Sequence, residues 1–278
     1  MSDVATVRRR RTGRFIVTKE HRRFVEFADA VRREGYIGLC YGPAGVGKTL
    51  SARRYANWDA AEDLLTNWGP RTEDDAKVYA ALARSRTVFY TPVVKATYQE
   101  FVADLDQLIA RVNSCIDQHV RPGAPGAPTY GCGQYIDLLV IDEADRLQPI
   151  SLEHLRDRFD RRRLGLLLIG MPGIEKRLAV YPQLYSRIGF AHQYRALTDD
   201  ELAFVITRHW KRLGLDLDLG DFTDAQAVAA VARITRGNFR LVHRLFTQVE
   251  RILKINALSV ITTDVIEAAR STLVIGAE

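Results

Sequence analysis

The sequence predicts an α/β fold, in which a doubly wound parallel sheet is followed by a small all-helical lid. Three observations support this fold class. A strand, a complete phosphate-binding loop at residues 42–49 and a helix follow one another early in the chain. Short apolar segments then alternate with helical segments up to residue 197, as in parallel sheets. Beyond that residue the hydrophobic spacing is only helical.

In the first half of the sheet region, apolar runs predict strands and apolar residues at helical spacing predict helices. Residues 58–86 are mixed and polar with helical pieces, and their sequence places no clear element. Residues 121–128 contain three prolines and two glycines in close succession and can only form a loop. The elements expected here are helices over 18–34, 49–57 and 97–119 and strands over 36–41 and 87–91.

The second half repeats the alternation and then becomes helical. The sheet elements expected are strands over 135–141, 164–169 and 190–194, with helices over 151–162 and from Pro172 through Val180. Capping boxes at Thr198 and Thr223 open the first two lid helices. Two further helices are expected over 238–255 and 263–273. We therefore divide the chain into a flexible basic arm (1–17), an α/β nucleotide-binding core (18–197) and a helical lid (198–278).

Composition excludes several classes of protein. The hydrophobic fraction of 47% and the charged fraction of 27% are ordinary for a globular domain. No apolar run has membrane-spanning length, so no membrane partner is expected. The three cysteines include no C-x-x-C pair, which argues against a disulfide framework or a zinc site and suits a cytoplasmic location.

The positive charge is concentrated at the N-terminus. Residues 1–35 hold ten Lys and Arg against five Asp and Glu, within a formal net charge of +6 for the whole chain. Such an arm, with Arg8, Arg9, Arg10 and Arg11, can bind nucleic acid phosphates or an acidic partner. The alternative is a solvated tail that binds nothing.

The phosphate-binding loop consists of Gly42, Pro43, Ala44, Gly45, Val46, Gly47, Lys48 and Thr49. Its glycines allow backbone N–H groups to face a polyphosphate at the N-terminus of the following helix. Lys48 is expected to reach the β- and γ-phosphates of ATP, and the Thr49 hydroxyl is expected to bind Mg²⁺. The alternative is a glycine-rich turn, which the flanking strand and helix make the weaker interpretation.

A second acidic site follows the third strand. Asp142 stands directly after four aliphatic residues and suits a carboxylate that holds Mg²⁺ through water. Glu143 beside it can orient or deprotonate the water that attacks ATP. The alternative for the pair is a helix N-terminal cap.

The loop, the Asp-Glu strand and the helical lid together resemble the AAA+ ATPases. In that family an arginine finger stands where this chain has Ser186-Arg187, and a second sensor stands where it has Gly237-Asn238-Phe239-Arg240. The resemblance implies that Arg187 reaches the ATP of a neighbouring subunit and that Arg240 contacts its own nucleotide. For either arginine the alternative is a surface salt bridge.

One position departs from the family. The first sensor is commonly Asn, Ser or Thr, but this chain has Ile169-Gly170-Met171 after the fourth strand. No polar side chain is available there to align water with phosphate. We therefore expect ATP hydrolysis to be slow and to depend on assembly.

Within AAA+ proteins the whole-chain layout resembles the transposon-encoded regulators TniB, TnsC and phage Mu B. That resemblance implies a homo-oligomer, as a ring or a helical filament, that assembles non-specifically on duplex DNA in the ATP state and recruits a transposase, possibly with a target-selection protein. In those proteins the residues just past the second strand touch DNA. Lys95 and Thr97 hold these positions here, where a solvated loop and a helix cap are equally open.

Two other functions stay open from the sequence. One is a replication initiator or loader of the AAA+ type, although those proteins usually append a winged-helix domain. The other is an AAA+ switch in secretion or signalling that does not bind DNA, with the basic arm on an acidic partner. ATP-dependent, salt-sensitive binding to duplex DNA separates this last alternative from a transposition regulator.

Overall fold

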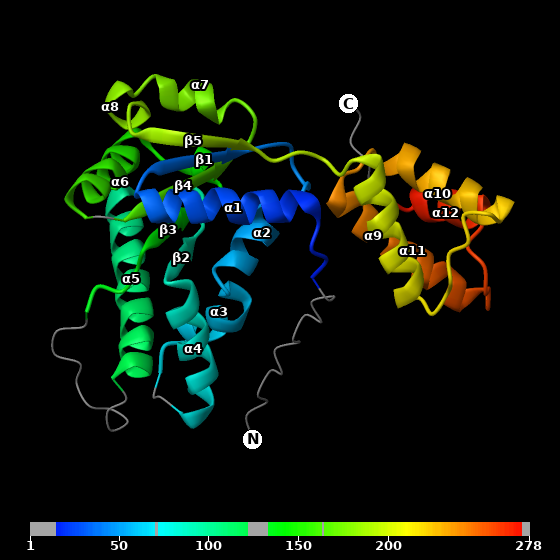
Figure 1. Cartoon of the computed structure of the whole chain (residues 1–278), viewed down its shortest axis with the longest axis horizontal. Coiled ribbons are helices and arrows are strands. Elements are labelled where there is room, and N and C mark those ends of the chain that lie inside the picture. The colour runs from blue at the N-terminus through cyan, green and yellow to red at the C-terminus, as the bar shows by residue number, and fades with distance from the viewer. Residues whose placement is uncertain (1–14, 70–71, 122–132, 163, 274–278) are drawn as a thin grey trace.

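The computed structural model describes residues 15–69, 72–121, 133–162 and 164–273. Its core is a five-stranded sheet with the order β2-β3-β4-β1-β5, in which every neighbouring pair is parallel (Figure 1). The strands are β1 (Ile37–Tyr41), β2 (Thr87–Tyr90), β3 (Leu138–Ile141), β4 (Gly165–Gly170) and β5 (Ile188–Gln193). This arrangement confirms the predicted α/β fold with a parallel sheet.

The composition of the strands follows from their position in the sheet. β3 and β4 have neighbours on both sides, and every residue in them is buried. A strand that is covered on both faces needs no polar alternation, which explains the unbroken apolar run at Leu138–Ile141. β5 lies at the edge, and most of its residues are exposed or half-buried.

One helix of the α/β core precedes the first strand, and the others connect successive strands. They are α1 (Lys19–Glu34), α2 (Lys48–Tyr55), α3 (Trp58–Thr66), α4 (Ala76–Ser85), α5 (Tyr98–Val120), α6 (Pro149–Arg161), α7 (Ile174–Ala179) and α8 (Pro182–Tyr185). Two short 3₁₀ turns lie at Glu73–Asp75 and Ala144–Arg146. The segment 58–86, which the sequence left unplaced, thus forms α3, the first of these turns and α4.

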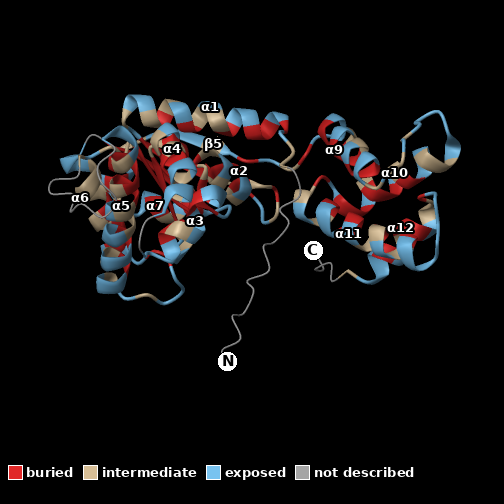
Figure 2. Ribbon diagram, turned by 90° about the horizontal axis from the view of Figure 1, so that it is seen from below, coloured by how far each residue is buried: buried red, intermediate tan, exposed pale blue. Residues whose placement is uncertain are grey.

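The C-terminal part is a bundle of four helices, which we call the lid. They are α9 (Asp199–Arg212), α10 (Phe222–Thr235), α11 (Phe239–Ile255) and α12 (Thr263–Ser271). Their buried side chains form a hydrophobic cluster separate from that of the sheet, with Trp210 and Phe246 fully buried in it. Figure 2 shows buried residues inside both parts, with exposed residues around them.

Two predicted boundaries are wrong in the lid and at the sheet edge. The cap of α10 is Asp221 rather than Thr223, because the Asp221 carboxylate accepts hydrogen bonds from the N–H groups of Thr223 and Asp224. β5 spans residues 188–193 instead of 190–194, because Ile188 pairs with Ile37 of β1.

Two further boundaries in the core also differ from the prediction. α6 begins at Pro149, two residues before the predicted start, because proline suits the first helical turn, where no N–H partner is needed. β3 begins at Leu138 rather than at residue 135, since the N–H of Tyr135 is bonded to the Asn113 side chain instead of to a strand.

Some predictions concern residues outside the described part. Arg8, Arg9, Arg10 and Arg11 lie there, as does most of the predicted loop at 121–128. In the part of the chain that the structure describes, no helix has both the length and the apolar character needed to cross a membrane.

Candidate nucleotide-binding site

The phosphate-binding loop joins β1 to α2, and close contacts explain two of its glycines. A Cβ on Gly42 would lie 2.1 Å from the carbonyl oxygen of Tyr194, so any other residue would force the backbone there to move. Gly45 has a φ of +81°, and a Cβ there would lie 2.6 Å from Oδ1 of Asn238. Left-handed backbone and a narrow space both favour glycine.

The N-terminus of α2, which carries a partial positive charge, faces this loop. Its N-cap is Gly47, and no side chain caps the turn. Unpaired N–H groups and the helix dipole make such an end a binding site for anions. The loop and helix together therefore form a cradle that suits a polyphosphate.

Lys48 is buried within the same loop. Its Nζ donates hydrogen bonds to the carbonyl oxygens of Gly42, at 2.5 Å, and Pro43, at 2.8 Å. Burial lowers the pKa of Lys48, and the nearby acidic groups, including Asp142, partly oppose that shift. The ammonium group is thus held at the loop itself, where a phosphate could replace the carbonyl oxygens as acceptor.

Thr49 and Asp142 meet directly. The Thr49 hydroxyl donates a hydrogen bond to the Asp142 carboxylate, which is only 3% exposed. Burial raises the pKa of Asp142, and the bond from Thr49 partly offsets this. One hydroxyl and one carboxylate form the donor set that Mg²⁺ takes when phosphate oxygens complete its shell. The residues therefore fit a Mg²⁺–nucleotide site, although the described residues contain no cluster of three His, Cys, Asp or Glu that could hold a metal.

Glu143 has an unusual backbone. Its φ of 51° and ψ of 42° place a non-glycine residue in the left-handed region, directly after the end of β3. Such a conformation costs free energy and persists where the surroundings impose it, often at functional sites. The N–H of Glu143 donates to the Asp142 carboxylate, so the turn fixes the two acidic residues relative to each other.

A third acidic residue, Asp145 of the 3₁₀ turn after β3, lies beside the end of β4 and was not assigned to the site by sequence reasoning. Asp145 Oδ2 accepts a hydrogen bond from the N–H of Met171, at 2.8 Å. A Cβ on Gly170 would lie 2.6 Å from the same oxygen, so the glycine leaves room for it. The end of β4 has no polar side chain of its own. The turn that follows β3 supplies one there, the carboxylate of Asp145. The sequence signal that could have pointed to Asp145 was Gly170, a small residue near the place where a polar first sensor is expected.

The lid contacts the phosphate-binding loop through the start of α11. Asn238 Nδ2 donates to the Ala44 carbonyl oxygen at 2.9 Å, and Arg240 N–H donates to the Gly45 carbonyl oxygen at 2.9 Å. The Oδ1 of Asn238 also caps α11 by accepting from Leu241 N–H. The exposed Arg240 side chain therefore starts beside the loop, and its nucleotide-sensing role stays a prediction, while the role of Asn238 was not anticipated.

A buried hydrogen-bonded chain underlies the loop. The Ser51 hydroxyl lies 2.9 Å from His21 Nδ1 and 2.8 Å from the Tyr194 hydroxyl. Burial lowers the pKa of His21. These three side chains come from α1, α2 and the end of β5, so they tie together the elements that surround the phosphate-binding loop.

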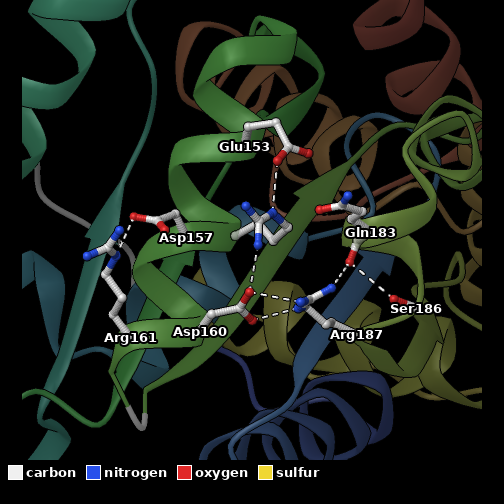
Figure 3. A network of polar contacts seen from close by, with 8 residues as sticks. Glu153, Asp157, Asp160, Arg161, Gln183, Ser186 and Arg187 are labelled. Atoms are coloured by element: carbon white, nitrogen blue, oxygen red, sulfur yellow. Dashed lines mark hydrogen bonds and ion pairs between the residues drawn. The ribbon is translucent and has the colours of Figure 1, made fainter.

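Arg187 lies at the beginning of β5, and its guanidinium is engaged within its own subunit. Nε and Nη2 donate to the two carboxylate oxygens of Asp160, and Nη1 donates to the carbonyl oxygen of Gln183. Figure 3 shows Arg187 turned toward Asp160 of α6. Within the single subunit, Arg187 therefore forms a salt bridge, which is the alternative that the sequence left open.

The two candidate DNA-binding residues after β2 lie on an exposed loop. Lys95 is exposed and has a φ of 63°. Thr97 caps α5, because its hydroxyl accepts from the N–H of Glu100 and the Glu100 carboxylate accepts from Thr97 N–H. Thr97 thus has a structural role already, whereas Lys95 extends from the surface.

The relatives of this chain among known proteins range from a near-full-length one to distant ones. A family model described as an AAA domain matches residues 31–178. A potential ATP-binding protein of Staphylococcus aureus is 45% identical over 271 residues, which are 94% of this chain and 97% of that protein. The Mu-like prophage FluMu DNA transposition protein B of Haemophilus influenzae is 26% identical over 66% of this chain and 52% of that protein. The Holliday junction branch migration complex subunit RuvB of Chlamydia felis is 26% identical over 50% of this chain and 44% of that protein.

Two solved structures with a similar fold show the same architecture. The Thermotoga maritima RuvB branch migration motor has a TM-score of 0.54 at 20% identity, covering 93% of this chain and 70% of that one. The Aeropyrum pernix ORC1 protein in complex with DNA has a TM-score of 0.55 at 18% identity, covering 92% of this chain and 65% of that one. At these identities they bear on the fold alone. The match to the AAA domain over more than half of the chain, with the near-full-length relative, shows that this protein belongs to the AAA+ ATPase family.

Proposed function

We propose that this AAA+ protein is an ATP-dependent, DNA-binding regulator of DNA transposition, which assembles on duplex DNA in its ATP state and recruits or activates a transposase. One observation carries the control by ATP: the first turn of α11 is hydrogen-bonded to the phosphate-binding loop at Ala44 and Gly45. Transposition in particular is supported by the similarity to a DNA transposition protein B over 66% of the chain.

ATP binding is assigned to the loop between β1 and α2. Lys48 would exchange the carbonyl oxygens of Gly42 and Pro43 for the β- and γ-phosphates, which satisfies its buried charge better than neutral acceptors do. The backbone N–H groups from Gly45 to Thr49 would hold the same phosphates. Arg240, which starts beside Gly45, would add a positive charge from the lid.

Thr49 and Asp142 would hold Mg²⁺, Asp142 through water. When bound, the metal ion would neutralise charge on the β- and γ-phosphate oxygens. The Thr49 hydroxyl would then turn its lone pair to the metal and keep its proton directed at Asp142, so the hydrogen bond already present fits both duties. This assignment needs one carboxylate only, which is normal for Mg²⁺ held largely by phosphates and water.

Hydrolysis would need Glu143 to orient the attacking water and accept its proton. Arg187 would act on the ATP of a neighbouring subunit, where its charge stabilises the transition state. No side chain of β4 aligns the water, since Gly170 and Met171 provide no polar group. We therefore propose slow, assembly-dependent hydrolysis, with ATP acting mainly as the signal for the assembled state.

DNA binding would use phosphate contacts without base readout. Lys95 and Thr97 lie on the loop after β2, and Arg8, Arg9, Arg10 and Arg11 belong to the basic arm. Each subunit would contribute few contacts, so a ring or filament of many subunits would give the affinity. The expected protein partners are a transposase and a target-selection protein, with a homo-oligomer as the active form.

The test is co-sedimentation of the protein with duplex DNA in the presence of ATP, of a non-hydrolysable ATP analogue, or of ADP. We expect binding with ATP or the analogue, little with ADP, and none for Lys48→Ala, which removes the phosphate contact. Affinity should fall steeply with salt, with a log–log slope of about −0.9 for each phosphate contact. If the parental protein with bound ATP ignores DNA at low salt, the transposition role is refuted and a DNA-independent AAA+ switch replaces it.

A further inference from the structure

The exposed side of α11 carries a regular row of basic side chains. Arg240, Arg244, Thr247, Arg251 and Lys254 are all exposed and are spaced by three, four or seven residues. At 100° per residue these positions fall on one side of a helix. We call this set the α11 ridge. From Arg240 to Lys254 it is about 21 Å long, at 1.5 Å per residue.

The opposite side of α11 fixes the direction of the ridge. Val242, Leu245, Phe246, Val249 and Leu253 are buried in the lid core. Their burial holds the helix in one rotation about its axis. The basic side chains therefore face solvent because of packing, and they form a surface of fixed geometry.

Three guanidinium groups of the ridge lack a compensating acid. Within the described ranges, Arg240, Arg244 and Arg251 form no ion pair, whereas Lys254 is paired with Glu250 at 2.8 Å. Elsewhere in the lid, Arg212 pairs with Glu250 and both Arg233 and Arg270 pair with Glu267, while Arg208 lies over the ring of Phe204. An uncompensated row of this length is therefore a distinct feature of α11 and favours a polyanionic ligand.

The middle of the ridge borders a hollow with further hydrogen-bond donors. Four of its lining side chains are polar donors, namely Arg244, Thr247, Gln248 and Thr272 after α12, and the others are Leu241, His243 and Leu273. Guanidinium, hydroxyl and amide groups are the side chains that bind phosphate oxygens of nucleic acids. The row of charges and the neutral donors therefore meet at the same place.

We propose that the α11 ridge binds the phosphate backbone of duplex DNA. Aromatic side chains are absent from the ridge residues, so the stacking surface that single strands use is missing. Trp and Tyr, which are enriched among the residues that dominate protein–protein binding, are missing from it as well. A duplex presents phosphates at regular spacing along its length, and this matches a straight row of arginines. The inference rests on the proposed DNA binding and adds a contact surface to it.

The same helix connects this surface to the nucleotide. α11 begins at the phosphate-binding loop, where Asn238 and Arg240 donate hydrogen bonds to loop carbonyl oxygens. Any change of α11 orientation between ATP and ADP moves the whole ridge. By reciprocity, DNA on the ridge must then change the affinity for ATP by the same factor as ATP changes the affinity for DNA.

The test is the double variant Arg244→Gln/Arg251→Gln, with the full chain and a non-hydrolysable ATP analogue. Arg240 is left unchanged because it belongs to the nucleotide site. Losing two phosphate contacts per subunit should reduce the log–log salt slope by about 1.8 and weaken binding at least about tenfold at moderate salt. ATP binding without DNA should be unchanged, which a titration with a fluorescent analogue measures.

The matched control is Arg233→Gln/Arg270→Gln. These two exposed lid arginines share the carboxylate of Glu267, so the same loss of charge removes no available phosphate contact. The control should bind DNA like the parent. The proposal that the ridge binds DNA would be overturned if the Arg244/Arg251 variant bound DNA as tightly as the parent. It would also be overturned if both double variants lost DNA affinity equally. Absence of DNA binding by the parent would instead refute the proposed function, and the ridge with it.

Discussion

The guanidinium of Arg187 and the carboxylate of Asp160 form a two-point ion pair, with Nε–Oδ1 at 2.6 Å and Nη2–Oδ2 at 2.9 Å. The hydrogen bond from Arg187 is the largest cause that lowers the pKa of Asp160. Asp160 also accepts from Arg156 at 2.6 Å. If a neighbour's phosphate took over Arg187, as we propose, Asp160 would keep Arg156 as a cationic partner, so the exchange would leave no unpaired acid.

Arg187 gives the first prediction, which concerns activity in mixtures. Arg187→Ala and Lys48→Ala should each be nearly inactive as ATPases, because one lacks the finger and the other lacks ATP. Mixed together, they should regain part of the activity where an intact Arg187 faces an intact phosphate-binding loop. The measurement is phosphate release at increasing total protein concentration.

Two controls accompany this experiment. Each variant must co-assemble with the parent, which sedimentation of a labelled subunit shows. Asp157→Asn changes an α6 acid that pairs with Arg161 instead of Arg187, so it should leave the activity of the parent intact. If the mixture releases no phosphate although the two variants co-assemble, Arg187 does not act on the ATP of a neighbouring subunit.

Glu143 leads to the second prediction. Glu143→Gln should bind ATP as the parent does but should lose hydrolysis, since the amide cannot accept the proton of water. The Asp142 carboxylate and Thr49 stay in place, so Mg²⁺ dependence of binding should persist. Single-turnover measurements compare the two proteins, and turnover at the parental rate would assign the role to another residue. The parental rate itself should lie below about 1 s⁻¹, the low end for enzymes.

Asn238 allows the contact of the lid with the loop to be separated from helix capping. Asn238→Asp keeps an oxygen that caps α11 but loses the amide that donates to Ala44. It also sets a carboxylate against a carbonyl oxygen and near the phosphates. We expect ATP affinity to fall about tenfold or more, as for the loss of a hydrogen bond combined with charge repulsion. Thermal unfolding of the lid should remain close to that of the parent, and a large drop in its midpoint would show a structural role instead.

His209 predicts how the stability of the lid depends on pH. Its ring is buried and stacked on Phe246 at 4.5 Å, and burial is the main cause that lowers its pKa from 6.5 to about 4. The folded lid thus holds the ring neutral, whereas the unfolded chain binds a proton below pH 6.5. The free energy of unfolding should therefore fall as the pH decreases from 6.5 toward 4, by up to about 1.4 kcal/mol per pH unit.

The variant His209→Phe checks this assignment because it keeps an aromatic ring against Phe246 and cannot titrate. Its thermal midpoint should fall less than that of the parent between about pH 7 and about pH 5. His243, whose pKa is also lowered by burial, still titrates in this variant and leaves a smaller pH dependence. Equal slopes in both proteins would show that His209 does not govern the acid response.

The sequence was most informative where structure is local. The phosphate-binding loop lies between a strand and a helix, as predicted, because its spacing already encodes the turn. The strand before Asp142 could be predicted because a central parallel strand is apolar at every position. The helices at 58–66 and 76–85 were missed because Asn57 and Asp75 precede them without a side-chain cap.

The rest depends on residues that are distant in sequence. Asn238 contacts Ala44 across 194 positions, and no pattern around Asn238 announces this. The prediction for Arg187 used only the residues next to it in the sequence, whereas its acidic partner Asp160 lies in α6. Asp145 fills the end of β4 only because β3 and β4 are adjacent and Gly170 leaves space. Such contacts follow from the order of the strands, which the sequence alone did not specify.

The close approach of Tyr194 to Gly42 has a mechanical consequence. Tyr194 N–H donates to the Tyr41 carbonyl oxygen at 2.7 Å, so the chain is held to the last residue of β1, directly before the phosphate-binding loop, three residues before Leu197, which packs in the hydrophobic cluster of the lid. A rotation of the lid about this point would therefore pivot next to the proposed nucleotide site, so a small change there would become a larger displacement at the far side of the lid. α11 has 17 residues. At 1.5 Å per residue it is about 26 Å long, so a tilt of about 10° at its start would displace its far end by roughly 4 Å.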